Sequence, residues 1–271
     1  MRDEQMRDAE PVMREQLREL WFPSAGARLF AAERGDGPPV ILLHGGLATH
    51  QACWQFAGPL AARFRVITPD LRASGRSIDA GPLDWDRLAD DVAALAHHLG
   101  LARAVIGGVS FGAACAARVA LRHPALVRAL IVLSPAYGGV ELGLTAAQQA
   151  AMAAMDAAGR RAVAEGIAVL LPLFDALPDA IRARARALVA TYDPASVAAS
   201  TRFMASGAQP FAAAELAAIA CPTLVVPGAD PTHPPEAADV FRTHIPDCTV
   251  RAAGPADYAA AIADFVDRLP A

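Results

Sequence analysis

The chain has 271 residues, of which 54% are hydrophobic, and its formal net charge is −4 at neutral pH. This length and composition predict a globular protein with a full core, and the mild acidity argues against nucleic acid or an anionic membrane as a partner. No window approaches the ~18 consecutive apolar residues of a membrane span. The charged start from Met1 to Glu10 lacks the apolar centre of a secretory signal.

Short apolar runs alternate with longer helical patterns along most of the chain. The segments expected as strands are 17–22, 27–32, 40–43, 64–68, the run from 104 into the turn at 108–112, 129–133, 223–226 and 249–252. The segments expected as helices are 51–62, 85–99, the alanine-rich stretch after residue 110, 235–244 and 257–269. This alternation predicts βαβ units in a doubly wound, mainly parallel sheet, which is the α/β fold class.

Two regions depart from the alternation. Residues 136–213 are alanine-rich and helical in character, with an apolar break at 170–174, and we expect a helical insertion over the sheet. The pair Met152 and Met155 within it is expected to pack in a core. Residues 1–18 are polar with scattered apolar positions, and we expect a short helix or a loose extension there.

The strand-to-helix turn that follows the run from Ala104 carries the pattern G-x-S-x-G over residues 108–112. In this setting the turn strains the serine backbone and lifts its hydroxyl clear of the sheet, while the glycines let strand and helix approach closely. Ser110 would also lie at a helix N-terminus, which favours developing negative charge. We predict Ser110 to be a nucleophile; the alternative is a glycine-rich turn without chemistry.

Four landmarks together resemble the α/β-hydrolase family from about Trp21 to Leu269. They are His44-Gly45-Gly46 after the third strand, residues 70–77 after the fourth, the serine turn, and the Gly-x-Asp loop at 228–230. The resemblance implies a doubly wound sheet with a helical cap, and acyl chemistry through a serine, a histidine and an acid. A serine nucleophile argues against the branches that use aspartate, the haloalkane dehalogenases and epoxide hydrolases.

The resemblance also implies a division of the chain and a role for several residues. The division is an N-terminal extension (1–18), a core in two parts (19–135 and 214–271) and a cap (136–213). The backbone N–H groups of Gly46 and Phe111 would form the oxyanion hole, and Asp230 would be the acid. Asp70 is the rival carboxylate, but Arg72 and Arg76 nearby suggest a structural ion pair.

The main departure from the family is the missing histidine after the last strand, where residues 251–258 read RAAGPADY. Three readings stay open: His233 is the base, His50 in the pocket is the base, or the chain has none. His233 shares a loop with Asp230, which could hold its Nδ1–H and leave Nε2 facing Ser110. His44 is expected to be structural, and the others are expected at helix ends or in solvent: His97, His98, His123 and His244.

The expected function is that of a serine hydrolase that cleaves a small, mainly apolar ester or lactone through an acyl-enzyme. A serine-dependent lyase or C–C bond hydrolase, and a non-catalytic protein that binds a small hydrophobic ligand, are the alternatives. The expected partner is a small molecule, and neither a metal nor an organic cofactor is implied. Widely spaced cysteines favour free thiols and a cytoplasmic location: Cys53, Cys115, Cys221 and Cys248.

Overall fold

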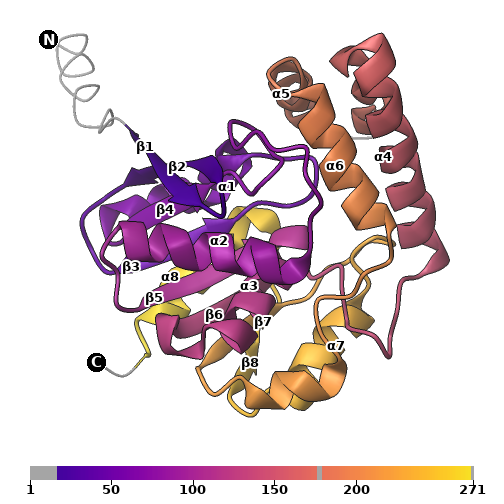
Figure 1. The fold of residues 1–271 in the computed structure, drawn as a ribbon. Coiled ribbons are helices and arrows are strands. Elements are labelled where there is room, and N and C mark those ends of the chain that lie inside the picture. The colour runs from indigo at the N-terminus through magenta and orange to yellow at the C-terminus, as the bar shows by residue number, and fades with distance from the viewer. Residues whose placement is uncertain (1–16, 176–178, 270–271) are drawn as a thin grey trace, which may run out of the picture.

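In the residues that this computed structural model describes (17–175 and 179–269), the centre of the molecule is an eight-stranded sheet (Figure 1). Its order is β1-β2-β4-β3-β5-β6-β7-β8, where β1 and β2 form an antiparallel hairpin, β2 is antiparallel to β4, and all later pairs are parallel. The strands are β1 Arg18–Ser24, β2 Ala27–Arg34, β3 Pro39–Leu43, β4 Arg65–Pro69, β5 Ala104–Val109, β6 Val127–Leu133, β7 Thr223–Val226 and β8 Cys248–Val250.

Helices cover both faces of the sheet, as predicted for a doubly wound fold. The α-helices are α1 His50–Ala57, α2 Trp85–His98, α3 Phe111–Arg122, α4 Ala146–Glu165, α5 Asp179–Val189, α6 Pro194–Ala205, α7 Pro235–His244 and α8 Tyr258–Val266. Helices α1 and α8 pack on one face, and α2, α3 and α7 pack on the other.

The central strands are buried on both faces, which explains why they read as unbroken apolar runs. Successive side chains of a strand point to opposite faces. In β3, Ile41 and Leu43 therefore belong to the core under α2 and α3, whereas Val40 and Leu42 belong to the core under α1 and α8.

The first turn of helix α3 lies close to the sheet at Gly112, which has no side chain. A Cβ placed on Gly112 would come within 2.4 Å of the Leu43 carbonyl oxygen, and one on Gly108 would come within 2.4 Å of the Gly112 carbonyl carbon. Both glycines are therefore required by the close approach that the sequence predicts for this turn.

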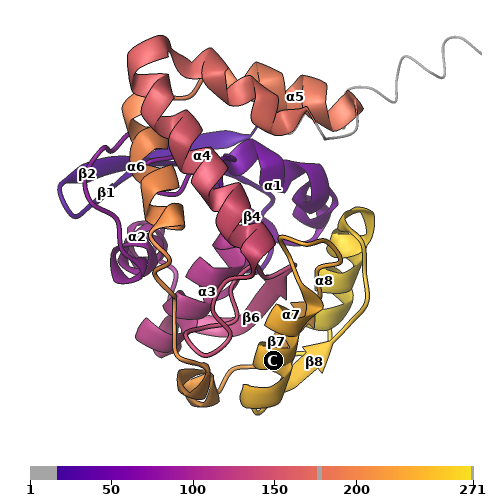
Figure 2. The same cartoon turned by 90° about the vertical axis from the view of Figure 1, so that its right-hand side faces the viewer.

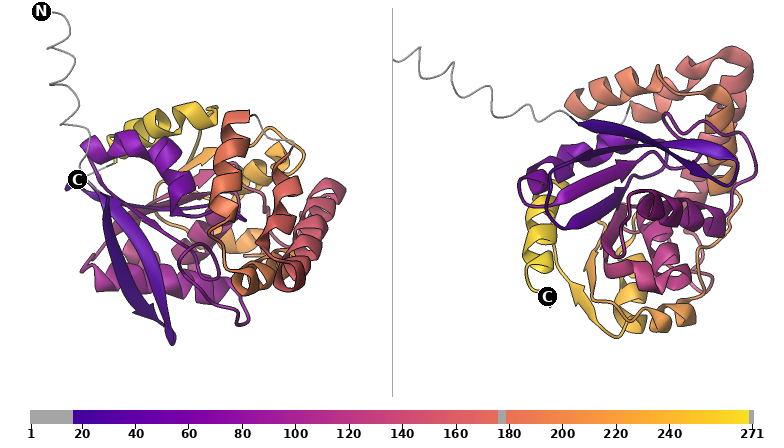
Figure 3. Two further views of the ribbon diagram at one scale, coloured as in Figure 1. Left: turned by 90° about the horizontal axis from the view of Figure 1, so that it is seen from above. Right: turned by 60° about the vertical axis from the view of Figure 1, so that its left-hand side comes forward.

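Residues 136–213 contain α4, α5, α6 and a 3-10 helix over Ile167–Phe174, with no strand in the described part of this range. These helices, called the cap helices below, lie together on one side of the sheet (Figures 2 and 3). They share a small apolar core formed by Ala158, Leu170, Val189, Tyr192 and Val197. The predicted apolar break at 170–174 lies within the 3-10 helix.

Some predicted boundaries were wrong. The helix expected over 51–62 ends at Ala57 and continues as a 3-10 helix over Gly58–Ala62, because Pro59 lacks the N–H that an α-helix would need. The predicted extension over residues 1–18 lies almost entirely outside the described residues. Across the described ranges, no helix is both long enough and apolar enough to cross a membrane.

Candidate active site

Ser110 lies at the sharp turn between β5 and α3, with φ 56° and ψ −113°. Positive φ is costly for a residue with a Cβ and marks backbone strain. The turn is held by the Ser110 amide, which donates to the Leu133 carbonyl oxygen at 3.0 Å. The serine is thus fixed at the start of α3, as the G-x-S-x-G pattern predicts.

His233 joins Ser110 to Asp230. Its Nε2 lies 2.8 Å from Ser110 Oγ, and its Nδ1 lies 2.8 Å from Asp230 Oδ2. Because a carboxylate can only accept a hydrogen bond, Nδ1 carries the proton and the Nε2 lone pair faces the serine hydroxyl. This order of groups can take the hydroxyl proton when Ser110 attacks.

Asp230 and His233 are three residues apart, and their side chains meet because the loop that carries both folds back on itself. Asp230 Oδ1 accepts from the Thr232 hydroxyl at 2.6 Å, from the Thr232 amide at 2.8 Å and from the His233 amide at 3.1 Å. A Cβ on Gly228 would come within 2.3 Å of the His233 carbonyl oxygen. We refer to residues 228–234 as the catalytic loop. Hydrogen bonds within this loop orient the Asp230 carboxylate and the His233 ring.

The carboxyl group of Asp230 is ionised at neutral pH. Partial burial by itself would raise its pKa, but the hydrogen bonds from Thr232 and His233 outweigh burial and lower the pKa to about 2. The side chain of Asp230 is 55% exposed and that of His233 is 24% exposed. The carboxylate thus reaches solvent, while the imidazole lies between it and the serine.

We expect Asp230→Asn to lower the rate of a reaction that begins at Ser110 by about 10⁴-fold, because the amide can donate to Nδ1 and thereby favour the wrong imidazole tautomer. Stability supplies a second readout. The folded pKa is about 2, below the value near 4 of an unfolded chain, so the carboxylate stabilises the fold above that unfolded value. The stability difference between wild type and variant, measured by urea unfolding, should therefore be constant at neutral pH and shrink as pH falls from about 4 to about 2. A difference that grows on acidification would contradict this assignment.

The predicted oxyanion-hole residues flank the serine. Phe111 is the first residue of α3, so its amide has no acceptor within the helix. Gly46 follows β3 and lines the same cavity as Ser110. A Cβ on Gly46 would come within 2.6 Å of Met204 Sδ, so a side chain here would force the Met204 side chain of the neighbouring cap helix α6 to move.

A cavity of about 160 Å³ opens beside Ser110 and His233. Its walls are mostly apolar, and they come from the start of α3, the segment after β6, the catalytic loop and the cap helices. The lining residues are Gly46, Ser110, Phe111, Ala136, Tyr137, Gln148, Ala151, Met152, Met155, Met204, Thr232 and His233. Met152 and Met155 pack with the main hydrophobic core, as expected, and they also form part of the cavity wall.

His50 is placed elsewhere, against the buried carboxylate of Asp70. Its Nδ1 and its amide lie 2.8 Å and 2.7 Å from Asp70 Oδ1, and it is not among the described residues that line the cavity. Burial alone would raise the pKa of Asp70, but His50 and the Arg76 amide lower it overall. The suggestion that His50 lines the pocket therefore does not match its position.

The ion pair suggested between Asp70 and the two nearby arginines was wrong. The fully buried guanidinium of Arg72 binds Asp91 and Asp79 instead. Arg76 offers Asp70 only its backbone amide, at 2.8 Å. The guanidinium of Arg76 pairs with Glu19 at 2.7 Å, so neither arginine side chain binds Asp70.

The remaining histidines have structural or surface positions. His44 is buried, donates from Nδ1 to the Gly45 carbonyl oxygen and accepts at Nε2 from the Leu71 amide. His123 and His244 lie at the ends of α3 and α7. His97 and His98 are exposed at the end of α2.

A tyrosine contact follows the loop in which the resemblance expects a histidine. After β8 the chain runs through residues 251–254 and a 3-10 helix over Pro255–Asp257 into α8. The Tyr258 hydroxyl at the start of α8 lies 2.7 Å from Ser134 Oγ. Ser134 directly follows β6, and its amide bonds to the Val226 carbonyl oxygen. Tyr258 therefore ties α8 to the strand ends next to the site.

Sequence reasoning missed Gln148, Thr232 and Met204. The capping-box pattern Thr145-x-x-Gln148 marks the start of α4 and could have shown that Gln148 lies in its first turn. Thr232 lies between Asp230 and His233, and a threonine hydroxyl in such a turn often bonds to a neighbouring residue. This pattern could have indicated that Thr232 orients the Asp230 carboxylate. Nothing in the sequence points to Met204, because its contact with Gly46 depends on how α6 packs.

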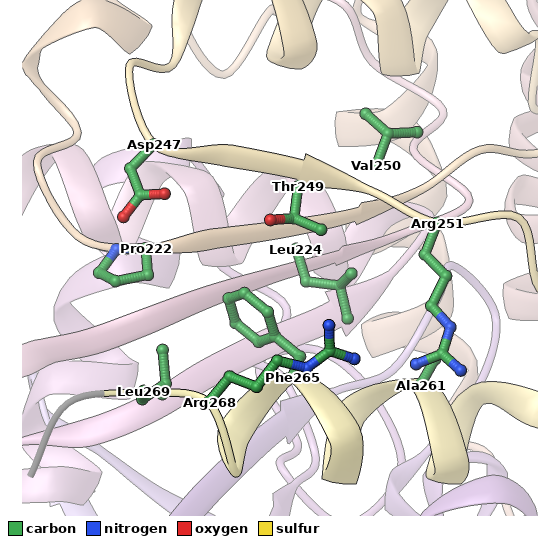
Figure 4. Close-up of a pocket in the computed structure, with 10 residues that line it drawn as sticks. All are labelled: Pro222, Leu224, Asp247, Thr249, Val250, Arg251, Ala261, Phe265, Arg268 and Leu269. Atoms are coloured by element: carbon green, nitrogen blue, oxygen red, sulfur yellow. The ribbon is translucent and has the colours of Figure 1, made fainter.

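A second hollow, of about 410 Å³, lies at the sheet edge between β8 and α8 (Figure 4). Leu224 and Phe265 form its apolar floor, and Arg251 and Arg268 extend over it. Arg251 is paired with Asp264 at 2.9 Å. This hollow holds none of the predicted site residues.

Known proteins resemble this chain in both sequence and fold. A family model described as alpha/beta hydrolase fold matches residues 38–256. The AB hydrolase superfamily protein YisY of Bacillus subtilis (strain 168) is 40% identical over 111 residues, 40% of this chain and 41% of that protein. The 2-hydroxymuconate semialdehyde hydrolase of Pseudomonas sp. (strain CF600) is 32% identical over 127 residues, 45% of this chain and 44% of that protein. These matches span less than half the length of the curated relatives.

Among solved structures, a thermophilic esterase from Thermogutta terrifontis has a TM-score of 0.75 at 24% identity, over 94% of this chain and 99% of that one. At this identity the likeness shows the fold, which agrees with the doubly wound sheet described above. Since the family model covers most of the chain, this protein belongs to the alpha/beta hydrolase fold family.

Proposed function

We propose that this protein is a serine hydrolase that cleaves a small, neutral, mainly apolar carboxylic ester or lactone through an acyl-enzyme. The observation that carries the proposal is the continuous chain from Ser110 Oγ through the His233 ring to Asp230, with 2.8 Å at each link. In this proposal the reaction takes place in the cytoplasm on a small molecule.

Acylation begins when Ser110 Oγ attacks the carbonyl carbon and its proton passes to His233 Nε2. Asp230 stabilises the resulting imidazolium and keeps the ring in position. The negative charge that develops on the carbonyl oxygen would be stabilised by the amides of Phe111 and Gly46 at the start of α3 and after β3. When this intermediate collapses, the carbonyl group re-forms, the bond between the acyl carbon and the alkoxy oxygen breaks, and the leaving alkoxide takes the proton from His233.

Deacylation repeats the same steps with water as the nucleophile. His233 takes a proton from the water, which attacks the acyl-serine, and returns it to Ser110 when the acid leaves. In a lactone the acyl and alcohol parts are one molecule, so a single hydroxy acid is released.

The substrate class is argued from the cavity lining. The methionine and alanine side chains of α4 and α6 form an apolar wall, and no carboxylate, lysine or arginine is among the described lining residues. An anionic acyl group would therefore lose its hydration without gaining a counter-ion, which costs several kcal/mol.

A matched pair of substrates tests this class. We expect kcat/KM for p-nitrophenyl butyrate to exceed that for the mono-p-nitrophenyl ester of succinic acid by about 10²-fold, because only the latter brings an unpaired charge into the cavity. The release of p-nitrophenolate measures both rates, and spontaneous hydrolysis of each ester is subtracted. Equal rates for the two esters would contradict a neutral, apolar acyl site.

Carbon–carbon bond hydrolysis is the second candidate, because a curated relative is named 2-hydroxymuconate semialdehyde hydrolase. Such a reaction would use the same three side chains on a different substrate. A protein without a base, which would only bind its ligand, is less well supported because His233 Nε2 lies within hydrogen-bond distance of Ser110 Oγ.

A further inference from the structure

We propose that Gln148, in the first turn of cap helix α4, is a positioning residue that holds the catalytic loop against Ser110. The role rests on the proposed function, because the loop carries both the acid and the base. The residue acts through His233 and does not itself take part in bond making.

The contacts of Gln148 are those of a side chain built to hold its surroundings. The residue is 2% exposed. Its Nε2 donates to the Thr232 carbonyl oxygen at 3.0 Å and to the Ala136 carbonyl oxygen, while Oε1 accepts from the Thr145 amide at 2.8 Å. One side chain thus joins the catalytic loop, the segment after β6 and the start of α4, with every polar atom satisfied.

The catalytic loop has few other links to the rest of the protein. Within the described residues, two hydrogen bonds reach residues 228–234 from outside the loop and α7: that from Gln148 to Thr232, and that between Ser110 and His233. The second bond is part of the reaction itself and changes as the proton moves. Gln148 is therefore the hydrogen-bonded anchor of this loop that stays in place throughout turnover.

Because one loop carries both Asp230 and His233, the bond from Gln148 affects the positions of both side chains. Asp230 and His233 are three residues apart and bonded to each other, so a shift of the loop moves both groups together relative to Ser110. The next residues of α4, among them Ala151 and Met152, line the substrate cavity. The helix that contacts the acyl group thus also determines the distance between base and nucleophile.

The first variant for the test is Gln148→Glu, and the matched control is Gln149→Glu. Glutamate keeps the acceptor for the Thr145 amide and suits this position of a capping box, but it presents oxygen to two carbonyl oxygens. Gln149 is the exposed neighbour on the same turn, and within the described structure its side chain bonds only to the Leu144 carbonyl oxygen. Gln148→Met is the second variant, of similar length and without charge, in case the glutamate variant does not fold.

We expect Gln148→Glu and Gln148→Met to lower kcat by about 10- to 100-fold with KM changed less than about threefold, since small misplacement of a reacting group has effects of this size. Gln149→Glu should match the wild type. In a His233→Ala background the Gln148 substitutions should cost less than about twofold, because a residue that acts through another shows no effect once that partner is gone. Equal losses with and without His233 would overturn the proposal.

A measurement independent of turnover separates this proposal from the proposed function. Amide hydrogen exchange of the peptide that covers residues 228–234 should be faster in Gln148→Glu than in Gln149→Glu, because the loop has lost its anchor. Unchanged exchange would overturn the anchoring role even if the protein hydrolyses esters. Faster exchange in a protein without esterase activity would support the anchor and count against the proposed reaction.

Discussion

Ser110→Ala should lower ester hydrolysis by roughly 10⁵- to 10⁶-fold, since the members of such a triad act as a unit. A methyl group in place of the hydroxyl leaves nothing to accept the acyl group, although the cavity and the amide donors remain. A fluorophosphonate supplies a direct test, because Ser110 Oγ displaces fluoride and forms a stable bond to phosphorus. Intact-mass measurement should show one adduct on the wild type and none on the variant.

Ser110→Gly is the control for folding. It removes the same hydroxyl, but glycine tolerates the positive φ of 56° without steric cost. The glycine variant should therefore be as inactive as the alanine variant. It should unfold at a higher temperature than the alanine variant, because backbone strain of this kind costs on the order of 1–3 kcal/mol. Full hydrolysis by either variant would remove Ser110 from the reaction.

His233→Ala should lower both kcat and the rate of phosphonylation of Ser110 by at least about 10³-fold. Without the imidazole at 2.8 Å, the serine hydroxyl keeps its proton and is a weak nucleophile. The measurement is the second-order rate of labelling by a fluorophosphonate, which needs no knowledge of the natural substrate.

Two other histidines provide the comparison. His97→Ala changes an exposed residue at the end of α2 and should leave labelling unchanged. His50→Ala leaves the buried carboxylate of Asp70 without its imidazole partner, so it should lower the unfolding temperature while the folded fraction still reacts at a rate close to that of the wild type. Loss of labelling in His50→Ala but not in His233→Ala would reverse the assignment.

The position of His233 sets this chain apart from the pattern that its resemblance implies. Asp230 and His233 share one loop, whose shape is set by hydrogen bonds from Thr232 and the His233 amide to Asp230. The segment where the histidine was expected instead leads to Tyr258, which contacts Ser134. The site is therefore built from fewer segments, and the catalytic loop depends on Gln148 for its attachment.

The fold and the strained turn at Ser110 could be predicted from the sequence because both depend on local patterns. Buried strands such as residues 40–43 are unbroken apolar runs, and the glycines around Ser110 follow from a close approach within one strand-turn-helix unit. The bond between Asp230 and His233 is also local, across three residues. These features are determined by residues close together in the sequence, so they can be predicted without knowledge of the tertiary structure.

The tertiary structure alone decided which histidine faces Ser110. His50 and His233 were both open candidates, and the difference between them is that Asp70 lies against the first while the second reaches a serine 123 positions away. The tertiary structure alone also shows the hydrogen bond from Gln148 to Thr232 and the contact of Met204 with Gly46. Gln148 and Met204 belong to the cap helices α4 and α6. Such contacts depend on how the cap helices and the sheet pack together, and no short stretch of sequence encodes that packing.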